Sequence, residues 1–194
     1  MRASDNRYER DIRKHTLARR MLTLGARTST IIQWTGLSRY RVQALARRYE
    51  HREYGDPRRR GISPYTVSYF GQTPSLELES LVLAFIVLEM HVIPPELIPD
   101  ARASLPELGR GERLLDAFDW YRRLVPMSQI SLERAVLLVL EFAEGQTLSL
   151  ARCSTCPNVM LVDQDGTIHA RCPACRTGHR NSPGTGQDAS TSSD

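Results

Sequence analysis

Residues 153–175 read CSTCPNVMLVDQDGTIHARCPAC and contain all four cysteines of the chain. The cysteines form two Cys-x2-Cys pairs, separated by the fifteen residues 157–171. This spacing is typical of zinc sites. Four thiolates supply the tetrahedral sulfur ligand set that Zn²⁺ prefers, and four protein ligands leave no position for water or substrate. The sequence therefore predicts one structural Zn²⁺ per chain, held by Cys153, Cys156, Cys172 and Cys175.

The segment between the two pairs supports this interpretation. Residues 159–162 and 167–170 have the composition of short strands, and Asp165-Gly166 between them favours a hairpin turn that returns the second pair to the first. The alternatives are two disulfides, a thioredoxin-like redox pair or four unrelated buried thiols, with His169 as an alternative ligand. Zinc is favoured because cytosolic proteins rarely keep disulfides and because four cysteines already complete a tetrahedron.

Basic charge is concentrated near the start of the chain. Residues 1–60 carry 16 Lys+Arg and 6 Asp+Glu, a net charge of +10, whereas the remainder carries 10 and 16, a net charge of −6. Fifteen of those 16 basic residues are Arg, whose planar fork binds phosphates and guanine edges through paired hydrogen bonds. Such a segment suits an acidic polymer, above all nucleic acid. Genomic base composition can explain the choice of Arg over Lys, but not the clustering.

Three helices are predicted in this basic region. Apolar residues at helical spacing predict a helix over residues 9–24, and capping residues begin two more, over 28–34 and 38–49. A turn at Gly36-Leu37 separates the second helix from the third. Two helices joined by a glycine turn resemble a helix-turn-helix, which residues 28–49 would form.

The third of these helices has an apolar face and a basic face. Val42, Leu45, Ala46 and Tyr49 recur at helical spacing, which leaves the polar residues on the other side, where they can enter a DNA major groove. A solvated helix face is the alternative. The candidate DNA-binding residues are Arg39, Arg41, Gln43, Arg47 and Arg48 on this helix, and Arg58, Arg59 and Arg60 in the Gly- and Pro-rich connection that follows it. The alternative for these last three is a linker without DNA contact.

From residue 61 onward the pattern is that of a helical core. Helices are predicted over residues 76–91, 107–124 and 131–144, each bounded by Pro or Gly. The last has more apolar residues than one stripe can bury, so it should pack on two sides or against a partner. The predicted fold class is mainly α, with a basic helical DNA-binding region (1–60), a helical core and partner-interaction region (61–148), a small four-cysteine, zinc-ribbon-like module (149–178) and a disordered tail (179–194).

Other classes of protein find no support in the sequence. It has no phosphate-binding glycine loop, Gly-x-Ser-x-Gly elbow or His-Glu-x-x-His motif, so no enzyme activity is expected. The first eleven residues lack the apolar stretch of a signal peptide. The longest apolar run, residues 81–88, falls well short of the ~20 residues of a membrane span. The sequence therefore predicts a cytoplasmic protein without membrane contact.

Several blocks of sequence are similar to one bacterial family. The blocks are MLTLGAR at 21–27, TGLSRYR at 35–41, GISPY at 61–65 and YF at 69–70, followed by EFAEG at 141–145, LSL at 148–150 and the two cysteine pairs. In order and spacing they resemble the FlhC family, a subunit of the flagellar master regulator. The similarity spans about residues 10–177.

The resemblance implies a transcriptional activator subunit for flagellum biogenesis. Members of the family work with FlhD in a heterohexamer of four D and two C subunits, bind and bend double-stranded promoter DNA upstream of flagellar operons, and recruit RNA polymerase. The C subunit carries most of the DNA binding, and its four matching cysteines bind zinc. Family members have a basic stretch after the last cysteine, whereas only Arg176, His179 and Arg180 are basic there in this chain.

Two other functions are compatible with parts of the pattern. A zinc-ribbon interaction protein would bind RNA or an acidic protein partner through the same basic N-terminal region. A redox enzyme would use one of the Cys-x2-Cys pairs, but neither pair lies in the strand-to-helix context of thioredoxin-like proteins. The ordered sequence blocks favour the DNA-binding activator.

Overall fold

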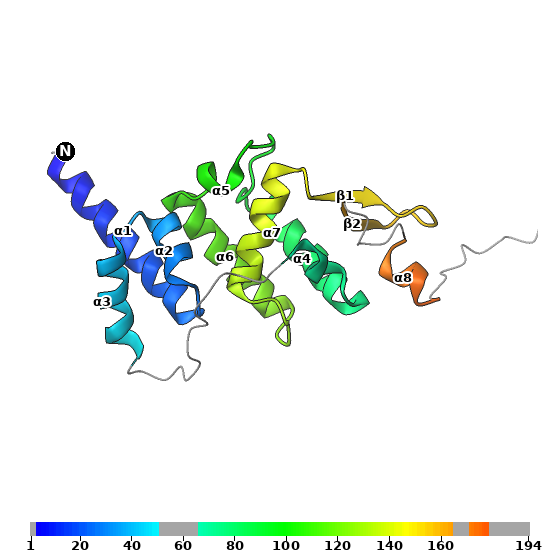
Figure 1. Ribbon diagram of the computed structural model, residues 1–194, viewed down its shortest axis with the longest axis horizontal. Helices are drawn as coiled ribbons and strands as arrows, with labels where there is room; N and C mark the ends of the chain where they lie inside the picture. Colours follow the sequence, from blue (N-terminus) through cyan, green and yellow to red (C-terminus); the bar gives the residue numbers. More distant parts are fainter. Residues whose placement is uncertain (1–2, 51–65, 165–170, 179–194) are drawn as a thin grey trace, which may run out of the picture.

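The computed structural model describes residues 3–50, 66–164 and 171–178, and most of these residues are helical, as predicted (Figure 1). The molecule is elongated, with α1–α3 at one end and the cysteine-containing segment at the other. The elements in chain order are α1 (Ala3–Thr23), α2 (Thr28–Thr35), α3 (Arg39–Glu50), the 3-10 helix η1 (Val67–Gly71), α4 (Pro74–Glu89), α5 (Ala101–Ser104), α6 (Leu108–Leu124), α7 (Leu132–Glu144), β1 (Leu148–Arg152), β2 (Val159–Asp163) and α8 (Pro173–Arg176).

One apolar core runs through the described part of the chain, from Leu17 in α1 to Leu161 in β2. At one end, α1 and α2 pack against α6, and α3 packs against both α1 and α2. In the middle, α4 packs between α6 and α7. The N-terminal helices therefore share their core with the central helices. The proposed boundary between residues 60 and 61 and the proposed tail, 179–194, both lie outside the described residues.

Local sequence signals explain where the helices begin and end. Thr73 caps α4, since its Oγ1 accepts a hydrogen bond of 3.1 Å from the backbone N–H of Leu76, and Pro74 occupies the first turn, where no backbone N–H is needed. Gly36 ends α2 with a φ of +66°, in the left-handed region that favours glycine. The predicted cap Ser38 accepts from Arg41 N at 3.4 Å and begins α3.

The helix α7 buries side chains around most of its circumference. Nine of its thirteen residues are buried, among α4, α5, η1 and β1. This fits the prediction that one apolar stripe could not absorb them all. Tyr69 and Phe70 of η1 are also buried in this core.

The sheet has two antiparallel strands, in a register that pairs Leu148 with Asp163 and Arg152 with Val159. The second strand is the one predicted at 159–162. Its predicted partner, 167–170, lies outside the described residues, and in the described part β2 pairs instead with β1, which was not predicted. Along β2, Leu161 joins the main core while Met160 and Val162 pack beside the cysteines. No helix in the described ranges has the length and apolar character to cross a membrane.

Gly111 lies where α6 comes close to α1 and α2. A Cβ at this position would lie 2.8 Å from Leu17 Cδ2 and 3.3 Å from Trp34 Cε3. Both side chains are 1% exposed, so neither has free space to move into. The absence of a side chain at Gly111 thus sets how closely the N-terminal helices approach the core.

We predict that Gly111→Ala lowers the free energy of unfolding by about 1 kcal/mol, because overpacking of ~1–3 kcal/mol outweighs the gain in helix propensity. The matched control is Gly109→Ala in the same helix, where a Cβ would meet only side-chain atoms at 3.9 Å. It should raise the free energy by up to ~1 kcal/mol. Urea unfolding measures both, and equal stabilisation by the two substitutions would contradict the close approach.

Candidate metal centre and basic surface

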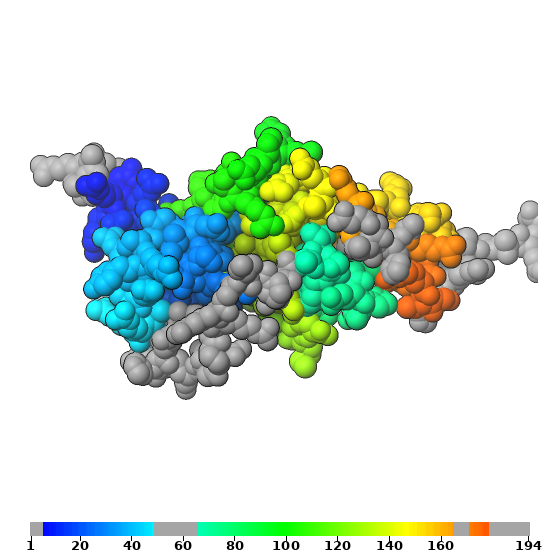
Figure 2. Space-filling model, viewed as in Figure 1, coloured from blue at the N-terminus to red at the C-terminus, as the bar shows by residue number. Residues whose placement is uncertain are grey.

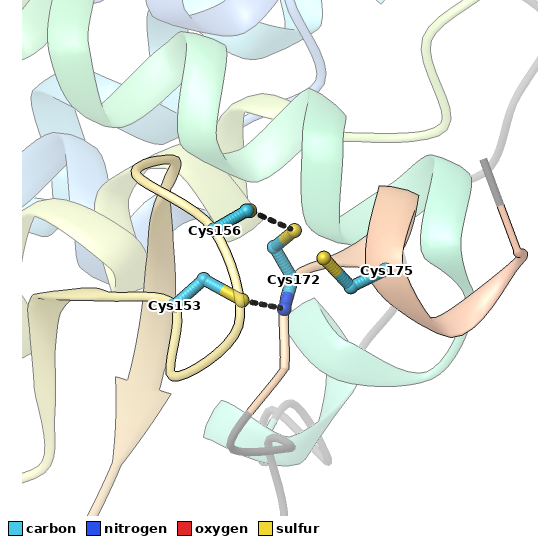
Figure 3. A group of neighbouring side chains, drawn as sticks. All are labelled: Cys153, Cys156, Cys172 and Cys175. Carbon is cyan, nitrogen blue, oxygen red and sulfur yellow. Dashed lines mark hydrogen bonds between the residues drawn. The ribbon is translucent and has the colours of Figure 1, made fainter. Parts of the chain in front are cut away.

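The four cysteines, 22 residues apart from first to last, come together at one point of the fold (Figure 3). Cys153 follows β1, Cys156 lies in the turn before β2, Cys172 precedes α8 and Cys175 lies within α8. Their Sγ atoms all lie within 4.8 Å of one another. Figure 3 shows the four side chains converging from the β1–β2 turn on one side and the start of α8 on the other. The prediction that the two pairs meet is confirmed.

The spacing of the sulfur atoms suits a tetrahedral metal site. Metal–sulfur bonds of about 2.3 Å in a tetrahedron give sulfur–sulfur edges of about 3.8 Å, and Cys156 Sγ lies 3.5 Å from Cys172 Sγ. All four cysteines are free thiols. The pairs therefore do not form the two disulfides considered as an alternative. Four sulfur donors at these distances can hold one metal ion, while the alternative ligand His169 lies outside the described residues.

Backbone N–H groups stabilise the thiolate form of Cys153. The N–H of Cys172 donates to Cys153 Sγ at 3.3 Å, and the N–H of Thr155 donates to the same atom at 3.4 Å. These two hydrogen bonds, that of Cys172 foremost, lower the pKa of Cys153 to about 6. The thiolate is the form that binds metals. Cys153 is thus the thiol that ionises most readily in this group.

The pKa of Cys175 is shifted in the opposite direction, mainly by the neighbouring thiols. Hydrogen bonding with Cys156, together with burial and the nearby charge of Cys153, raises the pKa of Cys175 to about 12. Like charges this close disfavour one another's ionised forms. A cation among the sulfurs removes this repulsion and lets all four ionise. The chemistry of the group therefore fits a metal ion that prefers thiolate ligands.

The cysteines are partly shielded from solvent. Cys153 and Cys172 are buried, Cys156 and Cys175 are half-buried, and Met160 forms a small cluster with them. Four ligands in such surroundings leave no open coordination position for a substrate. The arrangement therefore suits a metal that supports structure.

The helix α3 lies at the surface of the molecule, at the end formed by α1–α3 (Figure 2). The predicted residues Arg39, Arg41, Gln43, Arg47 and Arg48 are all exposed, while Val42 and Ala46 on the opposite face are buried. None of these four arginines forms an ion pair with a carboxylate of the described residues. The remaining predicted residues, Arg58, Arg59 and Arg60, lie outside the described part of the chain.

Other basic residues of the N-terminal region form ion pairs with carboxylates of α6 and α7. Arg13 Nε donates to Glu112 Oε1 at 2.9 Å, and this contact lowers the pKa of Glu112. Two further arginines bridge to α6 and α7: Arg20 contacts Asp116 and Asp119 at 2.8 and 2.7 Å, and Arg27 contacts Glu133 at 3.9 Å. The net charge of residues 1–60 therefore overstates the charge available to a partner.

Lys14 is a further basic residue near α3, and no sequence pattern indicates it. It comes from α1, yet its Nζ lies 3.7 Å from where a Cβ on Gly36 would stand. This places an ammonium group at the turn between α2 and α3. No local pattern could have identified it, because the contact depends on how α1 crosses the following two helices.

No protein-family model matches the chain, and a search of curated proteins finds no match. The similarity to the FlhC family therefore rests on the sequence blocks alone.

We predict that Cys172→Ser abolishes stoichiometric metal binding and opens the segment from β1 to α8, because metal-binding energy in such small modules, ~10–16 kcal/mol, is folding energy. Elemental mass spectrometry measures the metal, and hydrogen exchange of the β1 and β2 amides measures the opening. The control is Met160→Leu, a volume-conserving change in the same buried cluster, which should keep the metal. Protected strand amides in a metal-free, chelator-treated chain would contradict the prediction.

Proposed function

We propose that this chain is a zinc-stabilised, DNA-binding subunit of a transcriptional activator, of the kind that its resemblance to the FlhC family implies. It would work in the cytoplasm with an FlhD partner, bind flagellar promoters as part of a heterohexamer, and recruit RNA polymerase. The observation that carries the proposal is the exposed basic face of α3, whose arginines pair with no carboxylate of the described residues and which lies on a helix pair joined by a tight glycine turn. The ordered sequence blocks supply the biological context.

Zinc is the metal that the four thiols suit best. Tetrahedral sites with four sulfur donors bind Zn²⁺ or iron in iron–sulfur centres. Four cysteines in two Cys-x2-Cys pairs, which leave no open coordination position, favour a structural zinc ion. In this proposal the ion is structural, and no catalytic step passes through it.

The arrangement of α1–α3 supports major-groove binding. The second helix of a helix-turn-helix contacts base edges with residues near its start, while the preceding helix lies across the backbone. In α3, the first turns carry Arg39, Arg41 and Gln43, and the last turn carries Arg47 and Arg48. Arginine suits guanine edges and glutamine suits adenine edges. The first three would therefore read bases, while the last two would contact phosphates.

A second candidate function uses the same surface. An exposed arginine-rich helix face also suits RNA or an acidic protein, because the attraction of arginine to phosphates and carboxylates is not specific to DNA. Only partner choice separates these possibilities. The test therefore has to compare ligands as well as variants.

The direct test is coexpression with the FlhD of the same genome, followed by footprinting on flagellar promoters. The proposal expects a protected region that requires both chains and weakens steeply with salt, since arginine–phosphate contacts release counterions. Equal affinity for unrelated RNA, with no protected promoter region, would instead support the interaction protein.

We further predict that Arg39→Ala, Arg41→Ala and Gln43→Ala each weaken binding to the promoter by about 1–3 kcal/mol while leaving binding to unrelated DNA of equal length nearly unchanged. Arg47→Ala should weaken both equally, because phosphate contacts carry no sequence information. The control is Arg123→Ala on α6, which removes the same charge from an exposed position away from α3. Equal losses on both DNAs for all three substitutions would reduce α3 to a phosphate-binding helix.

A further inference from the structure

A buried carboxylate lies beside the metal centre, on a different part of the fold. Glu77 belongs to the first turn of α4 and is 1% exposed. Its Oε2 accepts a hydrogen bond from Arg176 Nη2, and the Arg176 side chain is itself only 18% exposed. Arg176 is the last residue of α8 and directly follows Cys175. The pair therefore joins the cysteine-containing segment to the helical core.

Arg176 is held firmly on the side of the cysteines. Its backbone N–H donates to Cys172 O at 3.1 Å, which closes the turn that carries the second cysteine pair. Its Nη1 donates to Arg171 O at 2.8 Å, on the residue that precedes Cys172. The guanidinium thus links the chain on both sides of the second cysteine pair to α4. This side chain therefore helps to hold that pair against the core.

The buried charge of Glu77 is compensated by Arg176. Among the described residues its other oxygen, Oε1, is buried and has no hydrogen-bond partner, and Arg176 provides its only ion pair. A buried carboxylate that loses its cationic partner is left with an uncompensated charge, which is strongly unfavourable. The start of α4 favours a negative charge but cannot replace a direct partner. Burial of Glu77 and docking of α8 therefore stabilise each other.

We propose that Glu77 is a positioning residue of the metal centre. Acting through Arg176, it holds Cys172 and Cys175 in the arrangement that binds the metal, and the bound metal in turn keeps Arg176 against the buried carboxylate. This inference rests on the metal binding proposed above. Because coupling between two sites is reciprocal, loss of the Glu77 charge lowers metal affinity, and loss of the metal loosens the contact between α8 and α4. Arg176, the first of the basic residues that follow the last cysteine, then serves the metal centre and is not available to DNA.

The test compares Glu77→Gln with Glu133→Gln. Both glutamates lie in the first turn of a helix and pair with an arginine, but Glu133 joins α7 to Arg27, at the other end of the molecule. Affinity is measured by competition with a zinc chelator, and the ligand set by the absorption spectrum of the Co²⁺-loaded protein, at a temperature where circular dichroism shows both variants folded. Glu77→Gln should lower metal affinity by about 10- to 100-fold, as loss of outer partners of metal ligands does. Glu133→Gln should leave it unchanged.

A second pair of variants shows whether Glu77 acts through Arg176. Arg176→Met should lower metal affinity at least as much as Glu77→Gln, and adding Glu77→Gln to Arg176→Met should lower it no further. If Glu77→Gln does not fold, Arg176→Lys keeps the charge without the fork, and its affinity should lie between those of the wild type and Arg176→Met.

Each outcome decides a different claim. A wild-type chain that binds neither Zn²⁺ nor Co²⁺ would overturn the metal centre itself. A wild-type chain that binds both, with Glu77→Gln unchanged in affinity and spectrum, would overturn only the positioning role. An equal loss of affinity from Glu77→Gln with and without Arg176 would also overturn it, because Glu77 would then act by another route.

Discussion

The structure around the cysteines depends on how four sulfur atoms within 4.8 Å of one another are held together. The apolar cluster around them is small, with Cys153, Met160 and Cys172 as its buried members among the described residues, and it does not hold this segment alone, since Leu148 and Leu161 pack in the main core. Nor can all four thiols ionise side by side without a cation, as the opposite pKa shifts of Cys153 and Cys175 indicate. A bound metal would replace the thiol repulsion with four bonds and add folding energy to the cysteine-containing segment.

From this centre a continuous path of packed elements leads to the proposed DNA-binding surface. The contact between Arg176 and Glu77 joins α8 to α4, α4 packs on α6, and α6 receives α1 and α2 at Gly111. The ion pairs of Arg13 and Arg20 bind α1 to α6 along the same interface. As a result, α3 packs on helices that are joined to the core, with one face buried and its basic face exposed to solvent.

The sequence predicted those features that depend on local pattern. The end of α2 followed from Gly36 and the start of α3 from the cap Ser38, and the faces of α3 followed from helical spacing. Contacts between distant segments could not be predicted. Arg13 pairs with Glu112, 99 positions away, so the number of basic residues in the N-terminal region did not show which arginines were already paired. Strand β1 was missed because its sequence LSLAR carries little strand signal, and it forms by pairing with β2. Glu77 resembled an ordinary polar position, since its partner Arg176 lies 99 positions away in the sequence.

The central claim, a closed centre of four thiolates around one zinc ion, is tested most directly by X-ray absorption at the zinc edge of the protein as purified. The account predicts one zinc per chain with four sulfur neighbours at about 2.3 Å and no nitrogen or oxygen ligand. A first shell that includes a nitrogen or oxygen neighbour at about 2.0–2.1 Å would show that at least one cysteine is not a ligand. Protein that remains fully folded without any metal would contradict the claim outright.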